Sequence, residues 1–135
     1  MIKFEILGKV QAKQRPRFGK GFTYTPQETV NYENYVKMCY KQASKEYFEQ
    51  GVALNVKIVV YYDIPKSFSK KKKEDVFYMR VRPTIKPDCD NIAKGICDAL
   101  NGIAWHDDSQ IVELTIVKSY GEQAKVIVEI EGITQ

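Results

Sequence analysis

The sequence has almost no histidine, and its few cysteines do not follow a metal-binding or disulfide pattern. It contains one histidine, His106, and three cysteines, Cys39, Cys89 and Cys97, without a C-x-x-C pair. One histidine is too few for a multi-histidine metal site or a two-histidine catalytic mechanism. An odd number of widely spaced cysteines argues against a disulfide framework and a four-ligand zinc site. Histidine-based and thiol-based chemistry are therefore not expected.

Long apolar runs, repeats and low-complexity linkers are also missing. No apolar run approaches the roughly 18 residues that span a bilayer. Residues 1–10 lack the apolar stretch and cleavage site of a signal peptide. With 135 residues, of which 44% are apolar and 28% charged, the chain has the composition of a globular domain. We expect a cytoplasmic protein without membrane contact, built as one domain over residues 1–135.

Acidic residues are scarce in the first part of the chain and concentrated in the second. Residues 1–82 hold 17 Lys/Arg and 8 Asp/Glu, a balance of +9, and residues 83–135 hold 4 Lys/Arg and 9 Asp/Glu, a balance of −5. The basic part suits a polyanion such as DNA or RNA. The acidic part is more informative because its aspartates are clustered.

The first half of the chain predicts a strand, a basic loop, a helix and a second strand. Alternating apolar residues indicate strands over residues 2–8 and 52–62. The tetrapeptide Thr-Pro-Gln-Glu at 25–28 has the pattern of a capping box with proline in the first helical position. Helical spacing of apolar residues then predicts a helix that ends near Glu49.

The second half predicts one firm helix and a terminal hairpin. A short helix fits residues 70–79 within an otherwise irregular segment. A helix capped by Asp88 or Asp90 ends at Asn101-Gly102, and strands over 111–118 and 125–131 are expected to pair. Their buried face should hold Val112, Leu114, Ile116, Val126, Val128 and Ile130. This interleaving predicts an α+β domain in which a single mixed sheet packs with two main helices.

Four aspartates and a lysine form the constellation with the clearest chemical meaning. Asp88 and Asp90 stand at the predicted helix start, and Asp107 and Asp108 immediately precede a strand. These two places can bring Asp88, Asp90 and Asp108 together beside Lys94. Carboxylate oxygens suit Mg²⁺ or Mn²⁺, which can activate water and neutralise charge on a phosphate. A lysine can bind that phosphate as a point charge. The pattern predicts phosphodiester hydrolysis.

A purely structural interpretation of these residues also stays open. Aspartate at a helix start is usually a cap. Asp90, Lys94 and Asp98 follow the i, i+4, i+8 spacing of a solvated helix face. Asp107-Asp108 fits a polar turn. Their concentration within about 21 residues of an otherwise basic protein slightly favours the catalytic interpretation.

Two sequence blocks resemble the RusA family of Holliday junction resolvases, which are common in bacteria and prophages. The first, Asp-x-Asp-Asn-x3-Lys-x3-Asp-Ala-Leu-Asn-Gly, spans residues 88–102, and the second, Trp-x-Asp-Asp-x-Gln, spans 105–110. Lys-Gln-Arg-Pro-Arg at 13–17 and Tyr-Thr-Pro at 24–26 also resemble relatives from Gram-positive bacteria and phages. The resemblance is weakest across residues 50–82.

The resemblance implies a homodimeric, Mg²⁺-dependent endonuclease that makes paired nicks in four-way junction DNA during recombination and repair. Mn²⁺ is expected to substitute, and no small-molecule cofactor is expected. The catalytic and metal-binding carboxylates fall on Asp88, Asp90 and Asp108, and the essential lysine falls on Lys94. Asp107 is a candidate auxiliary metal ligand. A branched-DNA-binding protein with little cleavage and a less selective Mg²⁺ nuclease remain alternative functions.

Basic residues outside the two blocks are candidates for DNA contact, which would make binding sensitive to salt. A solvated hairpin or a mobile, charged loop is the alternative role for the same residues. The candidates are Lys13, Arg15, Arg17, Lys70, Lys71, Lys72 and Lys73.

Overall fold

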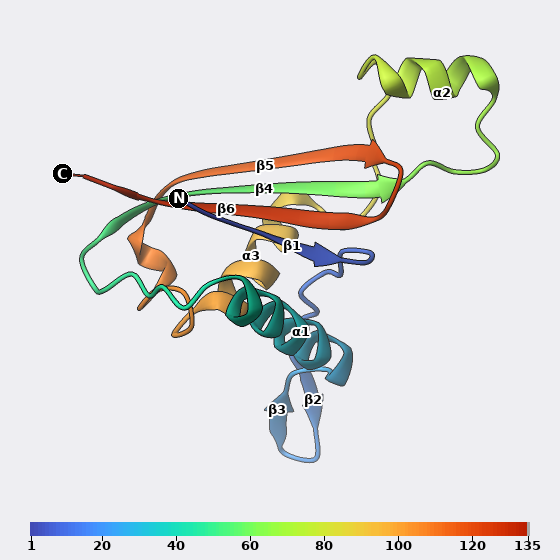
Figure 1. The fold of residues 1–135 in the computed structure, drawn as a ribbon. Coiled ribbons are helices and arrows are strands. Elements are labelled where there is room, and N and C mark those ends of the chain that lie inside the picture. Colours follow the sequence, from blue (N-terminus) through green and yellow to red (C-terminus); the bar gives the residue numbers. More distant parts are fainter. Residues whose placement is uncertain (135) are drawn as a thin grey trace.

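A computed structural model describes residues 1–134 of the chain. Four long strands form one mixed sheet, and two helices lie together against one of its faces (Figure 1). A short two-stranded hairpin and a third helix project from this body. The elements in chain order are β1 (Ile2–Leu7), β2 (Arg17–Gly19), β3 (Phe22–Tyr24), α1 (Gln27–Ala43), β4 (Ala53–Asp63), α2 (Lys70–Phe77), α3 (Cys89–Leu100), the 3₁₀ helix η1 (Asp108–Gln110), β5 (Ile111–Gly121) and β6 (Lys125–Ile133).

The strand order in the main sheet is β1-β6-β4-β5. Strand β6 is antiparallel to both β1 and β4, whereas β5 runs parallel to β4. The predicted pairing of the last two strands is therefore wrong. Consecutive strands usually pair, but here the connection after Gly121 passes over the end of β4. The Asp63 side chain fastens this crossing because its Oδ1 accepts a hydrogen bond from the Ala124 amide at 2.9 Å.

Strand β4 occupies the centre because alternate residues along it are all apolar and buried. The apolar face of β6 is buried as predicted, and it meets the same core. Helices α1 and α3 cover this face of the sheet (Figure 1). The residues that the sheet contributes to the core include Ile2, Phe4, Ile6, Leu54, Val56, Ile58, Val60, Val126, Val128 and Ile130.

The prediction for β5 is wrong at two of its three apolar positions. Val112 is 61% exposed and Leu114 is 46% exposed, while Ile116 packs against the core. Strand β5 forms an edge of the sheet, and its pairing with β4 is irregular between Leu54 and Asn55. Val112 and Leu114 therefore line a surface pocket instead of the core.

Helix α1 is shorter than the sequence predicts, and its start is different. Pro26 is the N-cap residue and no side chain caps the helix, so the predicted capping box does not form. The helix ends at Ala43 instead of near Glu49. After it, the Ser44 hydroxyl accepts a hydrogen bond from the Glu46 amide at 3.0 Å, which turns the chain away from the helix axis.

Helix α2 forms within the range that the sequence predicts. Ser69 caps it, and its hydroxyl accepts a hydrogen bond from the Lys72 amide at 3.1 Å. The helix stands off from one end of the sheet (Figure 1). Among the helices of residues 1–134, none is both long enough and apolar enough to cross a bilayer.

Candidate active site

Helix α3 positions the acidic block because its two faces differ in polarity. Ile92, Ile96 and Leu100 are buried against the sheet. Asp90 and Lys94 lie on the opposite face and are exposed. Burial of the apolar stripe therefore fixes the direction in which the charged side chains point.

Asp88 stands at the N-cap position of α3 but does not act as a side-chain cap. Its carboxylate makes no capping hydrogen bond, and the residue is exposed. Only its backbone carbonyl serves the helix, as the acceptor for the Ile92 amide at 3.0 Å. Asp90 follows in the first helical turn. A helix N-terminus carries a partial positive charge, so negatively charged side chains are favoured at both positions.

The segment that leads into Asp88 is held by Lys118 of β5. The Lys118 ammonium donates to the backbone carbonyls of Ile85 and Pro87, the second at 3.0 Å. Arg82 adds a bond in the other direction, since its Nε donates to the Lys118 carbonyl at 2.9 Å. A side chain of the sheet edge thus fixes the backbone one residue before the first acidic residue of the site.

The second acidic pair is held by η1 in the connection between α3 and β5. Asp107 caps η1, and its Oδ2 accepts from the Ser109 amide at 3.1 Å. Hydrogen bonding from Ser109, through its side chain and then its amide, lowers the pKa of Asp107, so this carboxylate stays ionised at neutral pH. Asp108, the next residue, is the first residue of η1.

Gln110 connects this turn to the segment after α1. Its side-chain oxygen accepts from the Asp107 amide at 2.9 Å. Its Nε2 donates to the carbonyls of Glu49 at 2.8 Å and Val52 at 3.0 Å. Gln110 is buried, so these bonds are shielded from water. These buried hydrogen bonds of Gln110 therefore fix the position of the turn that carries Asp108.

Trp105 anchors the loop between α3 and η1 in the hydrophobic core. It is fully buried, and its Nε1 donates to the Asn101 side-chain oxygen at 2.7 Å. Gly102 turns the chain with a φ of 76°, a conformation that favours glycine. The predicted stop of the helix at Asn101-Gly102 is confirmed.

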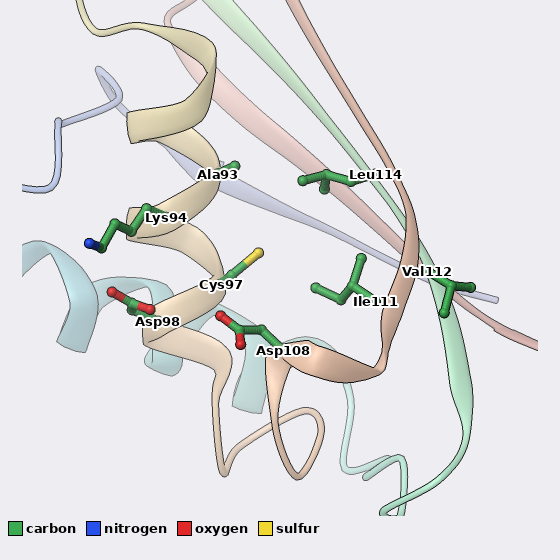
Figure 2. Close-up of a pocket in the computed structure, with 8 residues that line it drawn as sticks. All are labelled: Ala93, Lys94, Cys97, Asp98, Asp108, Ile111, Val112 and Leu114. Atoms are coloured by element: carbon green, nitrogen blue, oxygen red, sulfur yellow. The ribbon is translucent and has the colours of Figure 1, made fainter.

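One surface pocket lies between α3 and the start of β5, with a volume of about 450 Å³. Figure 2 shows Asp108 reaching toward α3, where Lys94 and Asp98 lie one turn apart. Cys97 points from α3 toward β5 (Figure 2). The lining residues are Ala93, Lys94, Cys97, Asp98, Asp108, Ile111, Val112 and Leu114.

The structure brings together part of the predicted site. Asp108 and Lys94 line one pocket, but Asp88 and Asp90 do not line it. Within residues 1–134, no group of three or more His, Cys, Asp or Glu side chains lies close enough to enclose a metal ion. Asp88 and Asp90 instead stand at the N-terminal end of the helix that carries Lys94.

Lys13 is partly buried and is held between two carboxylates. Its ammonium pairs with Glu33 of α1 and, at 3.3 Å, with Asp98 of α3. Partial burial lowers the pKa of Lys13, but hydrogen bonds and charges from Glu33 and Asp98 outweigh this effect and raise it above its usual value. Lys13 therefore joins two helices at the rim of the pocket, and Asp98 is partly neutralised.

The remaining basic candidates are exposed on the two projecting parts. Arg15 and Arg17 lie at the base of the β2–β3 hairpin. The lysines at 70–73 form the first turn of α2. Lys71 pairs with Asp75 at 3.7 Å, and Lys72 lies over the Phe68 ring at 4.2 Å from its centroid.

Cys97 is the only cysteine that lines the pocket. Burial, together with the negative charges of Asp108 and Asp98, raises the pKa of its thiol to about 12. The thiol is therefore protonated at neutral pH and is a poor nucleophile and a poor ligand for soft metals. Cys89 is exposed at the start of α3.

Sequence reasoning missed Lys118 and the roles of Lys13 and Gln110. Lys118 is one basic residue in an alternating strand, and its carbonyl partners belong to an irregular segment. Lys13 was assigned to DNA because its neighbours are basic, and its two carboxylate partners are distant in sequence. For Gln110, the only signal in the sequence was its position at the end of the block at residues 105–110.

Fold and site together define a small α+β protein with an acidic, lysine-bearing pocket at the edge of a mixed sheet and basic segments projecting around it. The chain belongs to the family of RusA endodeoxyribonucleases, because the family model described as endodeoxyribonuclease RusA matches residues 8–131. This match confirms the resemblance carried by the two acidic blocks. The family acts on branched junction DNA as a hydrolase.

Two curated relatives cover most of this chain. It is 40% identical over 140 residues to the uncharacterized protein YqaN of Bacillus subtilis (strain 168). The alignment covers 98% of this chain and 97% of that protein. It is 31% identical over 116 residues to the crossover junction endodeoxyribonuclease rusA of Lactococcus phage r1t. The alignment covers 85% of this chain and 81% of the phage protein.

Proposed function

We propose that this protein is a Mg²⁺-dependent endodeoxyribonuclease that resolves Holliday junctions by paired, symmetric cleavage in the cytoplasm. The observation that carries the proposal is that Asp108, from the turn before β5, and Lys94 of α3 line one pocket. The match of residues 8–131 to the RusA family supports the class of reaction.

The donor set of the site fits a hard divalent cation. Asp88, Asp90 and Asp108 offer carboxylate oxygens, and the neighbouring Cys97 thiol stays protonated. Mg²⁺ is usually bound through one or two carboxylates, water and substrate phosphates, so a preformed three-carboxylate cage is not required. We propose these three residues as ligands and Asp107 as an auxiliary ligand. When bound, the ion neutralises charge on the phosphate and lowers the pKa of water.

The side chains of the chain supply the remaining functions. Lys94 is exposed and forms no ion pair within the described part of the chain, so its ammonium is available to a phosphate oxygen. Lys13 neutralises Asp98 beside it, which limits repulsion of a polyanion from the pocket. The Asp88 carboxylate makes no capping hydrogen bond, and Asp90 follows it in the first turn of the helix.

A homodimer is proposed on symmetry grounds. A four-way junction has two-fold symmetry, and its resolution requires two equivalent cuts. A C₂ dimer presents two copies of one site in that relationship. Two chains acting independently would leave singly nicked junctions.

The test of the proposed function is cleavage of a labelled synthetic four-way junction, with linear duplex of the same arm sequence alongside. We expect paired symmetric nicks in the junction alone, with Mg²⁺ or Mn²⁺ but not with EDTA. Metal-dependent cutting of both substrates would replace the proposal with a less selective nuclease. Junction binding without cutting in either metal would replace it with a branched-DNA-binding protein.

Lys118→Met is expected to lower junction cleavage about 10-fold to 100-fold, the usual effect of losing a group that orients metal ligands. The change frees the carbonyls of Ile85 and Pro87, so the backbone before Asp88 loses its anchor. The half-saturating Mg²⁺ concentration should rise, and Lys118→Arg should restore part of the activity. Initial rates across a Mg²⁺ titration measure both effects.

Lys125→Met is the matched control for Lys118→Met. Lys125 lies on β6, and its ion pair with Glu5 is on the surface at 3.3 Å. Its loss should leave the Mg²⁺ dependence unchanged. Equal effects of the two substitutions would show that Lys118 acts only through general charge.

A further inference from the structure

The β2–β3 hairpin is a separate two-stranded sheet that projects from the body of the protein (Figure 1). It carries three exposed aromatic residues: Phe18 is 81% exposed, Phe22 60% and Tyr24 43%. An isolated hairpin has no core in which to bury such rings. Exposed aromatic residues gathered on one projecting element are typical of a binding surface.

The two faces of the hairpin are different. Residues paired across the strands share a face, so the pairs Arg17–Tyr24 and Gly19–Phe22 place these four residues together. Phe18 belongs to the opposite face with its partner Thr23. One face therefore combines two aromatic rings with a guanidinium, and the other carries a single ring.

Glycine at position 19 makes the aromatic face continuous. A Cβ atom at Gly19 would lie 3.0 Å from Cε1 of Tyr24, so the Tyr24 ring lies across the glycine backbone. The ring centroids of Phe22 and Tyr24 are 6.1 Å apart at an interplanar angle of 55°. The face is thus a broad apolar surface whose shape depends on the absence of a side chain at position 19.

The charged residues in and around the hairpin are all basic. Residues 11–27 contain four basic residues and no acidic residue. Among the residues that the structure describes, Arg15, Arg17 and Lys20 form no ion pair. Aromatic rings that stack on bases, combined with unpaired cations, match the chemistry of single-stranded nucleic acid.

The hairpin is anchored at the rim of the candidate active site. Lys13, four residues before β2, pairs with Asp98, which lines the pocket with Lys94 and Asp108. The Gln14 amide donates to the Thr29 hydroxyl at 3.2 Å, which fastens the base of the hairpin to α1. The chain segment that leads into the hairpin therefore contacts both the pocket rim and α1.

We propose that the β2–β3 hairpin is a base-stacking arm whose Phe22–Tyr24 face binds bases left unpaired at a DNA branch point. Arg17 and Lys20 pair with the phosphates on either side of those bases. The inference rests on the proposed function and adds the part of the substrate that this arm recognises. Phe18, on the opposite face, takes no part in the stacking.

The test measures binding to a four-way junction that carries 2-aminopurine at the branch point, with EDTA present to prevent cleavage. Phe22→Ala and Tyr24→Ala should each weaken junction binding about 5-fold to 150-fold, the range for losing one stacked base. The fluorescence change of 2-aminopurine on binding should be lost, and Phe22→Trp should retain it. Binding of linear duplex should be unchanged.

Phe18→Ala is the matched control, because it removes a ring that is even more exposed from the opposite face of the same hairpin. It should bind the junction as the wild type does, and all variants should keep the wild-type melting temperature. Wild-type junction affinity in Phe22→Ala, or equal loss in Phe18→Ala, would overturn the inference. A dimer that becomes a monomer in Phe22→Ala would also overturn it, since the face would then bind a second copy.

The inference and the proposed function fail in distinguishable ways. If the wild-type protein neither binds nor cuts the junction, the proposed function is wrong. If the wild-type protein cuts the junction and the hairpin variants bind with unchanged affinity and fluorescence, only the stacking arm is wrong.

Discussion

Asp108→Asn is expected to reduce the rate of junction cleavage at least about 100-fold while leaving junction binding in EDTA intact. A metal that stabilises transition-state charge contributes several kcal/mol, and each 1.36 kcal/mol corresponds to about tenfold in rate. Asp108 lines the pocket with Lys94, and the turn that carries it is held by Gln110 and Trp105. Asparagine keeps the size of the side chain but removes its charge.

Initial rates on the labelled junction and gel-shift affinities in EDTA separate the two effects of this substitution. Glu122→Gln provides the control, because it removes one carboxylate from the exposed connection after β5, at the other end of the strand from Asp108. That variant should cut at the wild-type rate. A rate within tenfold of wild type for Asp108→Asn would limit Asp108 to a structural role in η1.

Trp105→Ala is expected to lower the free energy of unfolding by about 3–5 kcal/mol, the usual cost of removing a large buried aromatic side chain. Trp105 is fully buried in the main core, and its indole nitrogen donates to Asn101 at 2.7 Å. Its main chain also closes the loop, since the Gly102 amide donates to the Trp105 carbonyl at 2.8 Å. The substitution leaves a cavity in the core below the loop between α3 and η1.

Urea denaturation followed by circular dichroism measures this loss. Trp105→Phe should cost less, because it keeps most of the apolar contact and removes only the hydrogen bond to Asn101, worth about 1 kcal/mol. Tyr47→Ala, at an exposed position outside the helices and strands, should change stability by no more than about 0.5 kcal/mol. Equal stability of Trp105→Ala and Tyr47→Ala would show that the loop does not depend on the indole.

Local patterns predicted the elements that depend on local periodicity. Helix α3 has one apolar stripe and a glycine stop, and β4 alternates over its whole length, so both were predicted nearly to their ends. The same patterns failed at α1. Its apolar spacing continues past Ala43, but Ser44 and Tyr40 form competing bonds with Glu46 that end the helix.

The order of the strands in the sheet could not be predicted from the sequence. The central place of β4 between β5 and β6 follows from packing, and adjacent strands in sequence suggested a hairpin instead. The acidic blocks predicted that Asp88, Asp90 and Asp108 assemble beside Lys94. Asp108 and Lys94 line one pocket, whereas Asp88 and Asp90 do not line it. Their precise assembly depends on Lys118 and Gln110, whose partners lie 31 and 61 residues away.

The sheet order also sets when the protein can fold during synthesis. Strand β6 comes last among the strands but lies between β1 and β4, which contact each other in the sheet only through it. A nascent chain that ends before Lys125 has no template for joining its first strand to its central one. Pairing across such sequence separations is slow. The sheet that joins β1 to β4 therefore cannot close before β6 has been synthesised.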